Sequence, residues 1–328
     1  MIFFITFLRA LAACFITNAH YVGIYPTDLI ANGGLIGDVL FFAVSGYCLY
    51  NIKKMSFLQW YGKRIYRIYL PVLIMTTVYF LLGAYNFKEH NAVWWFLYPT
   101  YYHFVASIIV LYIPFYIFMR FDFFRNNLLK VMIIIAVVWI VIYVSIYDKN
   151  YYHIDTVREP MIRFLFMESM LLGALFRQND SNIRNKFKIW YPLAAIGAFF
   201  VYFTSKLLFS HRGNLAKLQI LNQFAIFTLL IFIFITFAGL DSKLEKMPRY
   251  IKSIIGFLSS ITLEIYLVQY VLIDLIRPIG HFPVNWIVLT ASIIGVAFLL
   301  HIVCKLIYKL ADIIIKKFQP INGRKNDI

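Results

Sequence analysis

The chain has 328 residues, of which 62% are hydrophobic and only 14% are charged, and its mean hydropathy is +0.75. An ordinary soluble domain is about half apolar and roughly a quarter charged, so this composition excludes a soluble globular protein. It predicts an all-α, polytopic integral membrane protein. Lys and Arg outnumber Asp and Glu by 31 to 15, but they fall mostly between apolar runs, which favours membrane orientation over nucleic-acid binding.

Apolar runs of about 20 residues, the length that crosses a bilayer, predict ten transmembrane helices. Their ranges are 3–22, 35–51, 68–86, 98–119, 128–147, 161–177, 188–208, 219–240, 255–276 and 285–308. They form one transmembrane domain, residues 1–315, followed by a short exposed tail, residues 316–328. Nearly all of the excess positive charge falls on one set of alternating connections, so both termini are predicted to lie in the cytosol.

The first run contains Arg9 and His20, two residue types that a membrane-spanning helix normally avoids. At about 100° and 1.5 Å per residue, they point within roughly 20° of one direction and lie roughly 16 Å apart along the axis. Arg9 then belongs to the cytosolic half and His20 to the outer end. Two interpretations stay open: one cavity that crosses the bilayer along this stripe, or two unrelated polar residues buried against neighbouring helices.

The second run is rich in glycine and contains one carboxylate. Gly37 and Gly46, together with a glycine pair at its start, permit close approach of helices or an unwound backbone. Asp38 lies at about the predicted depth of His20. It could orient the His20 imidazole for general-base chemistry, or it could cap the start of the helix.

A basic and aromatic stretch precedes the third predicted helix and contains Lys63, Arg64 and Arg67. Two arginines three residues apart lie one turn apart on neighbouring faces of a helix, and guanidinium groups can hold phosphates with two hydrogen bonds. The alternative is an anchor that contacts anionic lipid headgroups.

The remaining ionisable residues of the predicted spans suggest structural roles. Ion pairs are expected between Glu159 and Arg163 and between Asp274 and Arg277, because these pairs are four and three residues apart. Three residues near helix ends are expected to extend toward the membrane surface: Lys206, His301 and Lys305. No metal site is expected.

Several of these segments, in this order, resemble the acyltransferase 3 family of integral membrane acyltransferases. The matching segments are Arg9-Ala10-Leu11-Ala12 with His20, Gly37-Asp38-Val39 with Phe41-Phe42 and Ser45-Gly46, Lys63-Arg64-Ile65-Tyr66-Arg67 with Pro71, Trp95-Phe96-Leu97, and the stretch from Ser260 to Gln269. Gln269 stands where many members carry His. Glutamine can form hydrogen bonds but cannot take up a proton at neutral pH, so an acid–base role at this position is in doubt.

The resemblance implies an O-acyltransferase, most often an O-acetyltransferase, in the bacterial cytoplasmic membrane. The donor would be acetyl-CoA or another acyl-CoA, a substrate rather than a permanently bound cofactor, and the acceptor a cell-surface polysaccharide or lipid-linked glycan. Membrane lipid is the other expected partner, and nucleic acid is not expected. The oligomeric state is left open. A rival interpretation is a polysaccharide or lipid-linked glycan exporter or flippase that uses the same cavity.

The resemblance also implies roles for individual residues. Arg64, Arg67 and Lys63 would bind the acyl-CoA. His20 would act as a base or carry the acyl group covalently, with Asp38 orienting it. Arg9 would line the path of the donor or stabilise developing negative charge. Supporting roles fall to Ser45, Gly46, Trp95, Glu264, Tyr266 and Gln269.

Overall fold

The structure is a computed structural model that describes residues 2–52, 55–88, 90–97, 102–156, 160–278 and 280–318, and every regular element in these ranges is a helix. The longer helices are α1 (Phe3–Ala19), α2 (Gly34–Leu49), α3 (Phe57–Leu81), α4 (His103–Arg120), α6 (Leu128–Ser145), α7 (Ile162–Gln178), α9 (Trp190–His211), α10 (Gln219–Gly239), α12 (Arg249–Ser260), α13 (Thr262–Ile276) and α14 (Val284–Phe318). The short ones are η1 (Val93–Leu97), α5 (Asp122–Arg125), α8 (Asp180–Ile183), η2 (Gly213–Leu218) and α11 (Asp241–Glu245).

Each of the ten predicted segments contains a helix, but within the described residues six helices are long and apolar enough to cross a membrane by length and composition. These are α3, α4, α6, α9, η2 joined to α10, and α14. The pair α12 and α13 makes a seventh if it is counted as one bent span. Helices α1 and α2 are apolar but have only 17 and 16 residues. The multi-pass architecture is therefore supported, whereas the count of ten and the side of the termini stay predictions.

Some of the predicted helix boundaries are wrong. Helix α3 begins at Phe57 rather than at 68, because the Ser56 hydroxyl accepts a hydrogen bond from the Gln59 N–H at 3.4 Å and caps the helix there. The basic stretch that contains Arg64 and Arg67 is therefore helical. The predicted span 98–119 begins within residues 98–101, which lie outside the described part of the chain.

Two further boundaries differ toward the C-terminus. The predicted span 255–276 is not one continuous helix, because α12 and α13 meet at a bend of 69°. Helix α14 continues beyond 308 to Phe318, so the first residues of the predicted tail are helical. Residues 319–328 lie outside the described ranges.

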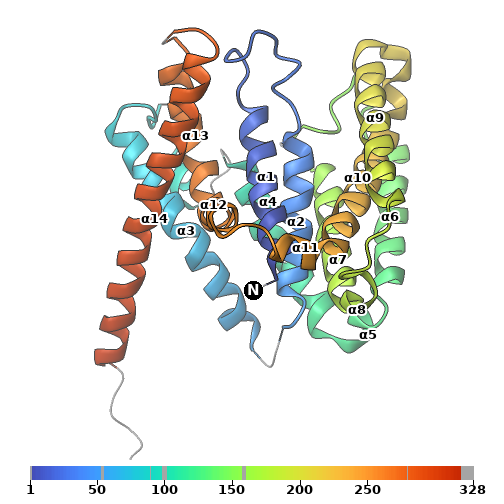
Figure 1. The fold of residues 1–328 in the computed structure, drawn as a ribbon, viewed down its shortest axis with the longest axis horizontal. Coiled ribbons are helices and arrows are strands. Elements are labelled where there is room, and N and C mark those ends of the chain that lie inside the picture. Colours follow the sequence, from blue (N-terminus) through green and yellow to red (C-terminus); the bar gives the residue numbers. More distant parts are fainter. Residues whose placement is uncertain are drawn as a thin grey trace, which may run out of the picture.

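Helices α1 and α2 stand side by side at the centre of the molecule (Figure 1), with α3, α13 and α14 on one flank and α6, α7, α9 and α10 on the other. Figure 1 views α12 along its axis and α1 from the side, so α12 crosses the bundle, and it contacts α1. We call the end at which α1 begins the N-terminal end, and the end at which α1 stops and α2 begins the opposite end. Helix α14 stops toward the N-terminal end.

Glycines hold α2 against both of its neighbours. A Cβ atom on Gly46 would lie 1.9 Å from the carbonyl oxygen of Met170 in α7, and one on Gly173 of α7 would lie 1.8 Å from the backbone of α2. A Cβ atom on Gly37 would lie 2.6 Å from the carbonyl oxygen of Ala12 in α1. Close helix approach is therefore confirmed as the role of Gly37 and Gly46, and backbone contacts join α1, α2 and α7.

A buried carboxylate holds the start of α1. Asp241, which is fully buried at the start of α11, accepts a hydrogen bond from the Phe4 N–H at 2.8 Å. The other carboxylate oxygen pairs with Nε of Arg184 at 2.6 Å. Negative charge at a helix N-terminus is favourable because the first N–H groups have no partner within the helix. This contact fixes the axial position of α1 and of every side chain along it.

Two predicted structural roles can be compared with the described contacts. The pair between Asp274 and Arg277 is confirmed, with 3.7 Å between Oδ1 and Nη2. Nζ of Lys206 pairs with Asp155 in the loop before α7 at 2.6 Å, and its extension toward the membrane surface stays a prediction. Glu159 lies outside the described residues, so its predicted pair with Arg163 stays a prediction.

Gly46→Ala is expected to destabilise the fold, because the added methyl group would collide with the backbone of α7. Overpacking of this kind costs about 1–3 kcal/mol, so the apparent Tm in detergent should fall by several degrees. Gly197→Ala in α9 is the matched control, since no atom lies within 4 Å of its added Cβ. Equal melting of the two variants would show that α2 and α7 can separate without cost.

Candidate active site

A cleft of about 550 Å³ opens between α1, α2, α3, α12, α13 and α14, and we call it the central cleft. Its ionisable lining consists of Arg9, Arg67, Glu264, His301 and Lys305. Ser45, one of the predicted supporting residues, lines it together with Phe41, Pro71, Ser259, Ser260, Thr262, Leu263, Cys304 and Tyr308. The cleft therefore brings together residues from both ends of the sequence, and its lining carries more positive than negative charge.

Guanidinium groups without a carboxylate partner gather at this cleft. Within the described part of the chain, Arg9, Arg64 and Arg67 make no ion pair; Arg9 donates to Sγ of Cys48 at 3.8 Å. Arg64 lies over the Trp60 ring at 5.7 Å, and its Nε is buried without a hydrogen-bond partner. Arg9 and Arg64 are partly buried and Arg67 is exposed. Cations that lack counter-charges create a positive potential, so the site favours an anionic ligand.

Lys63 does not share this environment. Its side chain is exposed, and Nζ lies 3.9 Å from Sδ of Met55. It does not line the central cleft. The structure thus brings Arg67 to the central cleft and places Arg64 beside it, while Lys63 points elsewhere.

One wall of the central cleft carries a pair that the sequence did not indicate. Nδ1 of His301 in α14 lies 2.8 Å from Oε1 of Glu264 in α13. The expectation that His301 extends to the membrane surface is wrong, because this contact turns it inward. Glu264 is buried, as expected for a supporting residue.

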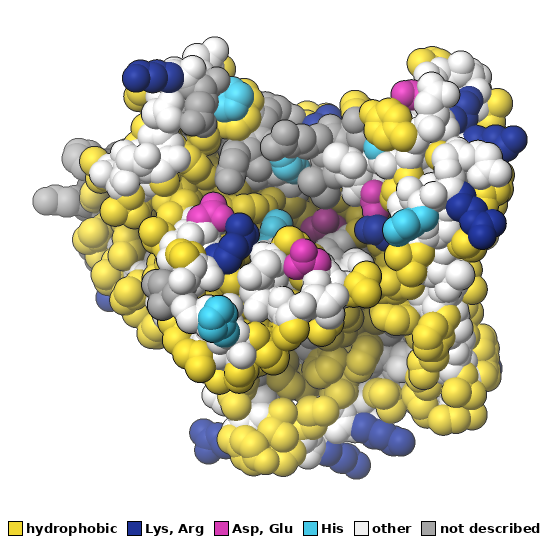
Figure 2. Space-filling view, turned by 90° about the horizontal axis from the view of Figure 1, so that it is seen from above, with side chains coloured by type: hydrophobic (Ala, Val, Ile, Leu, Met, Phe, Trp, Pro, Cys, Tyr) yellow, Lys and Arg dark blue, Asp and Glu magenta, His cyan; other side chains and the backbone are white. Residues whose placement is uncertain are grey.

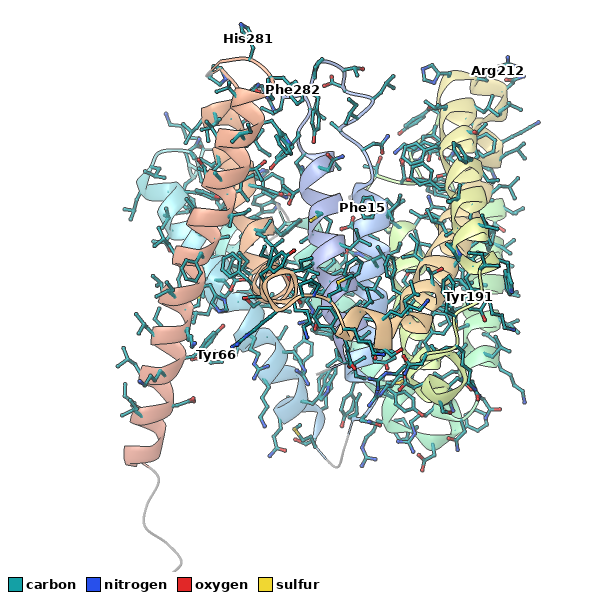
Figure 3. The ribbon with its side chains drawn as sticks, in the orientation of Figure 1. Phe15, Tyr66, Tyr191, Arg212, His281 and Phe282 are labelled. Atoms are coloured by element: carbon teal, nitrogen blue, oxygen red, sulfur yellow. The ribbon has the colours of Figure 1, made fainter. Side chains whose placement is uncertain are left out.

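Packing of aromatic rings joins α3 to α14 at the edge of the cleft. The Tyr66 ring, labelled in Figure 3, packs against the Tyr308 ring at 5.1 Å. The Tyr308 hydroxyl donates a hydrogen bond to the carbonyl oxygen of Arg67 at 3.1 Å. These contacts hold the helix that carries Arg67 against the helix that carries His301 and Lys305.

A small pocket of about 20 Å³ continues the central cleft toward the opposite end of the bundle. The two cavities share Phe41, Thr262 and Leu263. The small pocket is also lined by Ala13 and Thr17 of α1 and by Tyr266 of α13, among other residues. Its volume is about that of one water molecule, so it is the narrowest part of this route.

His20 lies beyond the small pocket, at the C-terminal end of α1. Its ring packs edge-on against Tyr270 at 4.9 Å, and the Tyr270 ring lies 5.8 Å from that of Tyr266. Arg9, Ala13, Thr17 and His20 lie on one face of α1, because successive members of this set are four, four and three positions apart. Arg9 lines the central cleft, and Ala13 and Thr17 line the small pocket, whereas His20 lines neither, so one cavity that crosses the bilayer along this stripe stays a prediction.

The structure does not bring His20 and Asp38 into direct contact. No hydrogen bond or ion pair between them is found among the described side chains. Asp38 is buried in the second turn of α2, and the helix is capped by Gly33 in the left-handed conformation, so the alternative that Asp38 caps this helix is wrong. Asp38 lies within electrostatic range of Tyr266. Orientation of His20 by Asp38 stays a prediction.

The other predicted supporting residues are buried in different surroundings. Tyr266 accepts a hydrogen bond from the Phe104 N–H at 3.4 Å. Gln269 is fully buried, and both polar atoms of its amide lack a partner within the described part of the chain. Trp95 stacks on Tyr85 at 4.1 Å and lines none of the cavities described above, which favours a packing role.

Figure 2 views the molecule from above, at the opposite end of the bundle, which also carries His281, Phe282 and Arg212 (Figure 3). Acidic, basic and histidine side chains gather around the middle of this face, and hydrophobic side chains cover much of its flanks. The end of the molecule near His20 is thus polar at its centre. Among the described residues, no group of three or more His, Cys, Asp or Glu could hold a metal ion.

Sequence reasoning missed Arg177 and Tyr270. Arg177, the last residue of the predicted span 161–177, lies in the last turn of α7 and lines a further cavity with Arg9 and Cys48. A basic residue in the last turn of a helix was the available signal. Tyr270 follows Gln269 directly, and its contact with His20 depends on how α1 and α13 pack.

The chain was compared with known proteins. The family model described as an acyltransferase domain matches residues 2–305. No curated protein and no solved structure shows significant similarity to the chain. The matched range contains Arg9, His20, both arginines of the α3 motif and most of the lining of the central cleft.

Inorganic pyrophosphate is expected to raise the apparent Tm of the purified protein, because it would neutralise the unpaired guanidinium groups. At ten times its Kd the ligand stabilises the folded state by about 1.4 kcal/mol. The double variant Arg64→Gln/Arg67→Gln should lose this shift, and Lys63→Gln should keep it. A shift of the same size in the double variant would show that the anion binds elsewhere.

Proposed function

The chain belongs to the acyltransferase 3 family. From this premise we propose that it is a membrane O-acyltransferase, and specifically an O-acetyltransferase. It takes the acyl group from a cytosolic acyl-CoA and delivers it to a hydroxyl group of a cell-envelope polysaccharide or its lipid-linked precursor. The observation that carries this proposal is the face of α1 that runs from Arg9 in the positively charged central cleft, past Ala13 and Thr17 in the small pocket, toward His20 at the end of the helix.

The donor end of the site is the central cleft in this proposal. Coenzyme A carries several phosphate groups, and the positive charge of Arg9, Arg64 and Arg67 suits them. Guanidinium groups hold phosphate oxygens with paired hydrogen bonds. The pantetheine arm would then extend past Phe41 and Thr17, and the thioester would approach His20 from the side of the small pocket.

The transfer step requires a base near the acceptor. His20 takes the proton of the sugar hydroxyl while the hydroxyl oxygen forms a bond to the carbonyl carbon of the thioester. The carbon–sulfur bond then breaks, and the thiolate of coenzyme A takes the proton from the imidazole. The products are an ester and free coenzyme A. The ring contact with Tyr270 of α13 positions the imidazole.

The size of the small pocket favours acyl transfer over export of a glycan. A volume of about 20 Å³ is far smaller than a sugar ring needs. Passage of a polysaccharide would require α1, α2 and α13 to separate. The pantetheine arm is a single chain that is narrower than a polysaccharide, even at its gem-dimethyl group, so this proposal needs the smaller rearrangement.

His20→Ala is expected to leave the amount of surface polymer unchanged and to abolish its acyl groups, because the base is removed and the fold is kept. Glycan NMR of cells that carry each variant measures both quantities. His211→Ala is the matched control, since His211 is an exposed histidine at the same end of the bundle. Normal acylation in His20→Ala would contradict the role of His20 as the base. Unmodified polymer trapped inside the cell would favour the rival function, export of the glycan.

Phe41→Trp is expected to slow acyl transfer while acyl-CoA binding is retained, because the larger ring narrows the route between the central cleft and the small pocket. Phe41→Leu should keep most of the activity, since it does not reduce the free space. Binding and single-turnover transfer are measured on the same preparations. Unchanged transfer in Phe41→Trp would place the path of the donor elsewhere.

A further inference from the structure

A second cavity lies at the N-terminal end of α1 and shares only Arg9 with the central cleft; we call it the side cavity. Its volume is about 210 Å³, and its polar lining consists of Thr6, Arg9, Tyr47, Cys48, Asn51 and Arg177. It is smaller than the roughly 300–1,000 Å³ that a drug-sized ligand occupies. The side cavity therefore suits one polar group rather than a whole nucleotide.

Arg177 is held in position by its surroundings. Nη1 donates a hydrogen bond to the Tyr47 hydroxyl at 3.2 Å, and the guanidinium lies 5.1 Å from the centre of the Tyr47 ring. The Tyr47 hydroxyl in turn donates to Asp180, whose carboxylate lies 3.8 Å from Arg177. Tyr47 is buried in the core. A guanidinium that is already ordered loses little conformational entropy when it binds a ligand.

Positive charge is in excess around the side cavity. Cys48 lies within electrostatic range of Arg9, Arg64 and Arg177. Among the described residues, the one carboxylate that pairs with any of these three arginines is Asp180, and its distance of 3.8 Å is too long for a direct hydrogen bond. The guanidinium groups of Arg9 and Arg177 line the side cavity, and Asp180 pairs with Arg177 alone, so the imbalance of charge favours a bound anion.

We propose that the side cavity is a second phosphate-binding subsite, in which Arg9 and Arg177 hold the 3′-phosphate of coenzyme A. The diphosphate, which is attached to the pantetheine arm, lies in the central cleft on the other contacts of Arg9. This inference rests on the proposed function and deepens it. It makes the donor a coenzyme A thioester and excludes carriers that present phosphopantetheine without the nucleotide.

Binding of acetyl-CoA and of 3′-dephospho-CoA to the full-length protein in detergent tests the subsite. The wild-type protein is expected to bind acetyl-CoA roughly 10-fold to 100-fold more tightly than 3′-dephospho-CoA, because the loss of charge-assisted hydrogen bonds has an effect of this size. We call the quotient of the two affinities the ratio. Free coenzyme A, measured in parallel, controls for the acetyl group. Arg177→Gln should bring the ratio close to one by weakening acetyl-CoA binding, with the affinity for 3′-dephospho-CoA unchanged. Arg177→Lys, which keeps the charge and the fold, should retain part of the ratio.

Two further variants separate the subsite from general effects. Arg125→Gln removes a half-buried arginine that pairs with Asp122 and lines none of the cavities described above, so it should leave the ratio unchanged. Arg67→Gln should weaken the binding of acetyl-CoA and of 3′-dephospho-CoA by a similar factor. A wild-type ratio near one, or an equal loss of both ligands in Arg177→Gln, would overturn the subsite and leave the proposed function standing. A wild-type protein that binds neither ligand would overturn both.

Discussion

The arrangement of the site depends on the backbone contacts that α2 makes with α1 and α7. Helices in a bilayer gain little from the hydrophobic effect when they associate, so close packing at small residues must hold them together. Gly37, Gly46 and Gly173 provide that packing, and each leaves no room for a Cβ atom. Because α2 can neither rotate nor slide without a backbone collision, Ser45 and Cys48 keep fixed positions next to α1.

Helix α1 connects the two halves of the proposed chemistry. Asp241 holds its first turn, and its 17 residues extend about 25 Å from there to His20. The helix therefore acts as a rigid spacer between the positive charges near its start and the imidazole at its end. The route along it narrows to a pocket of about 20 Å³. A thin acyl-carrying arm fits this geometry better than a polymer.

The arginines of the N-terminal end fall into two groups with different consequences. Arg184 pairs with the buried Asp241, so its charge supports the start of α1. Arg9 and Arg64 have no such partner within the described chain, and the buried Nε of Arg64 is left without a hydrogen bond. An unpaired, partly buried cation costs stability unless a ligand neutralises it. This contrast separates an arginine that stabilises the fold from arginines whose charge is available to a ligand.

The amino-acid sequence by itself determined the helical membrane architecture, the approximate places of the helices and the shared face of Arg9 and His20, because composition and helical periodicity are local properties. It also indicated Gly37 and Gly46 as sites of close approach, and it left Arg64 and Arg67 open between phosphate binding and a lipid anchor. The 69° bend before α13, the pair of Glu264 with His301, the separation of His20 from Asp38 and the place of Arg177 were decided by the tertiary structure alone. Each depends on which helices are in contact. For helices that are distant in the chain, packing determines these contacts, and the local sequence does not show them.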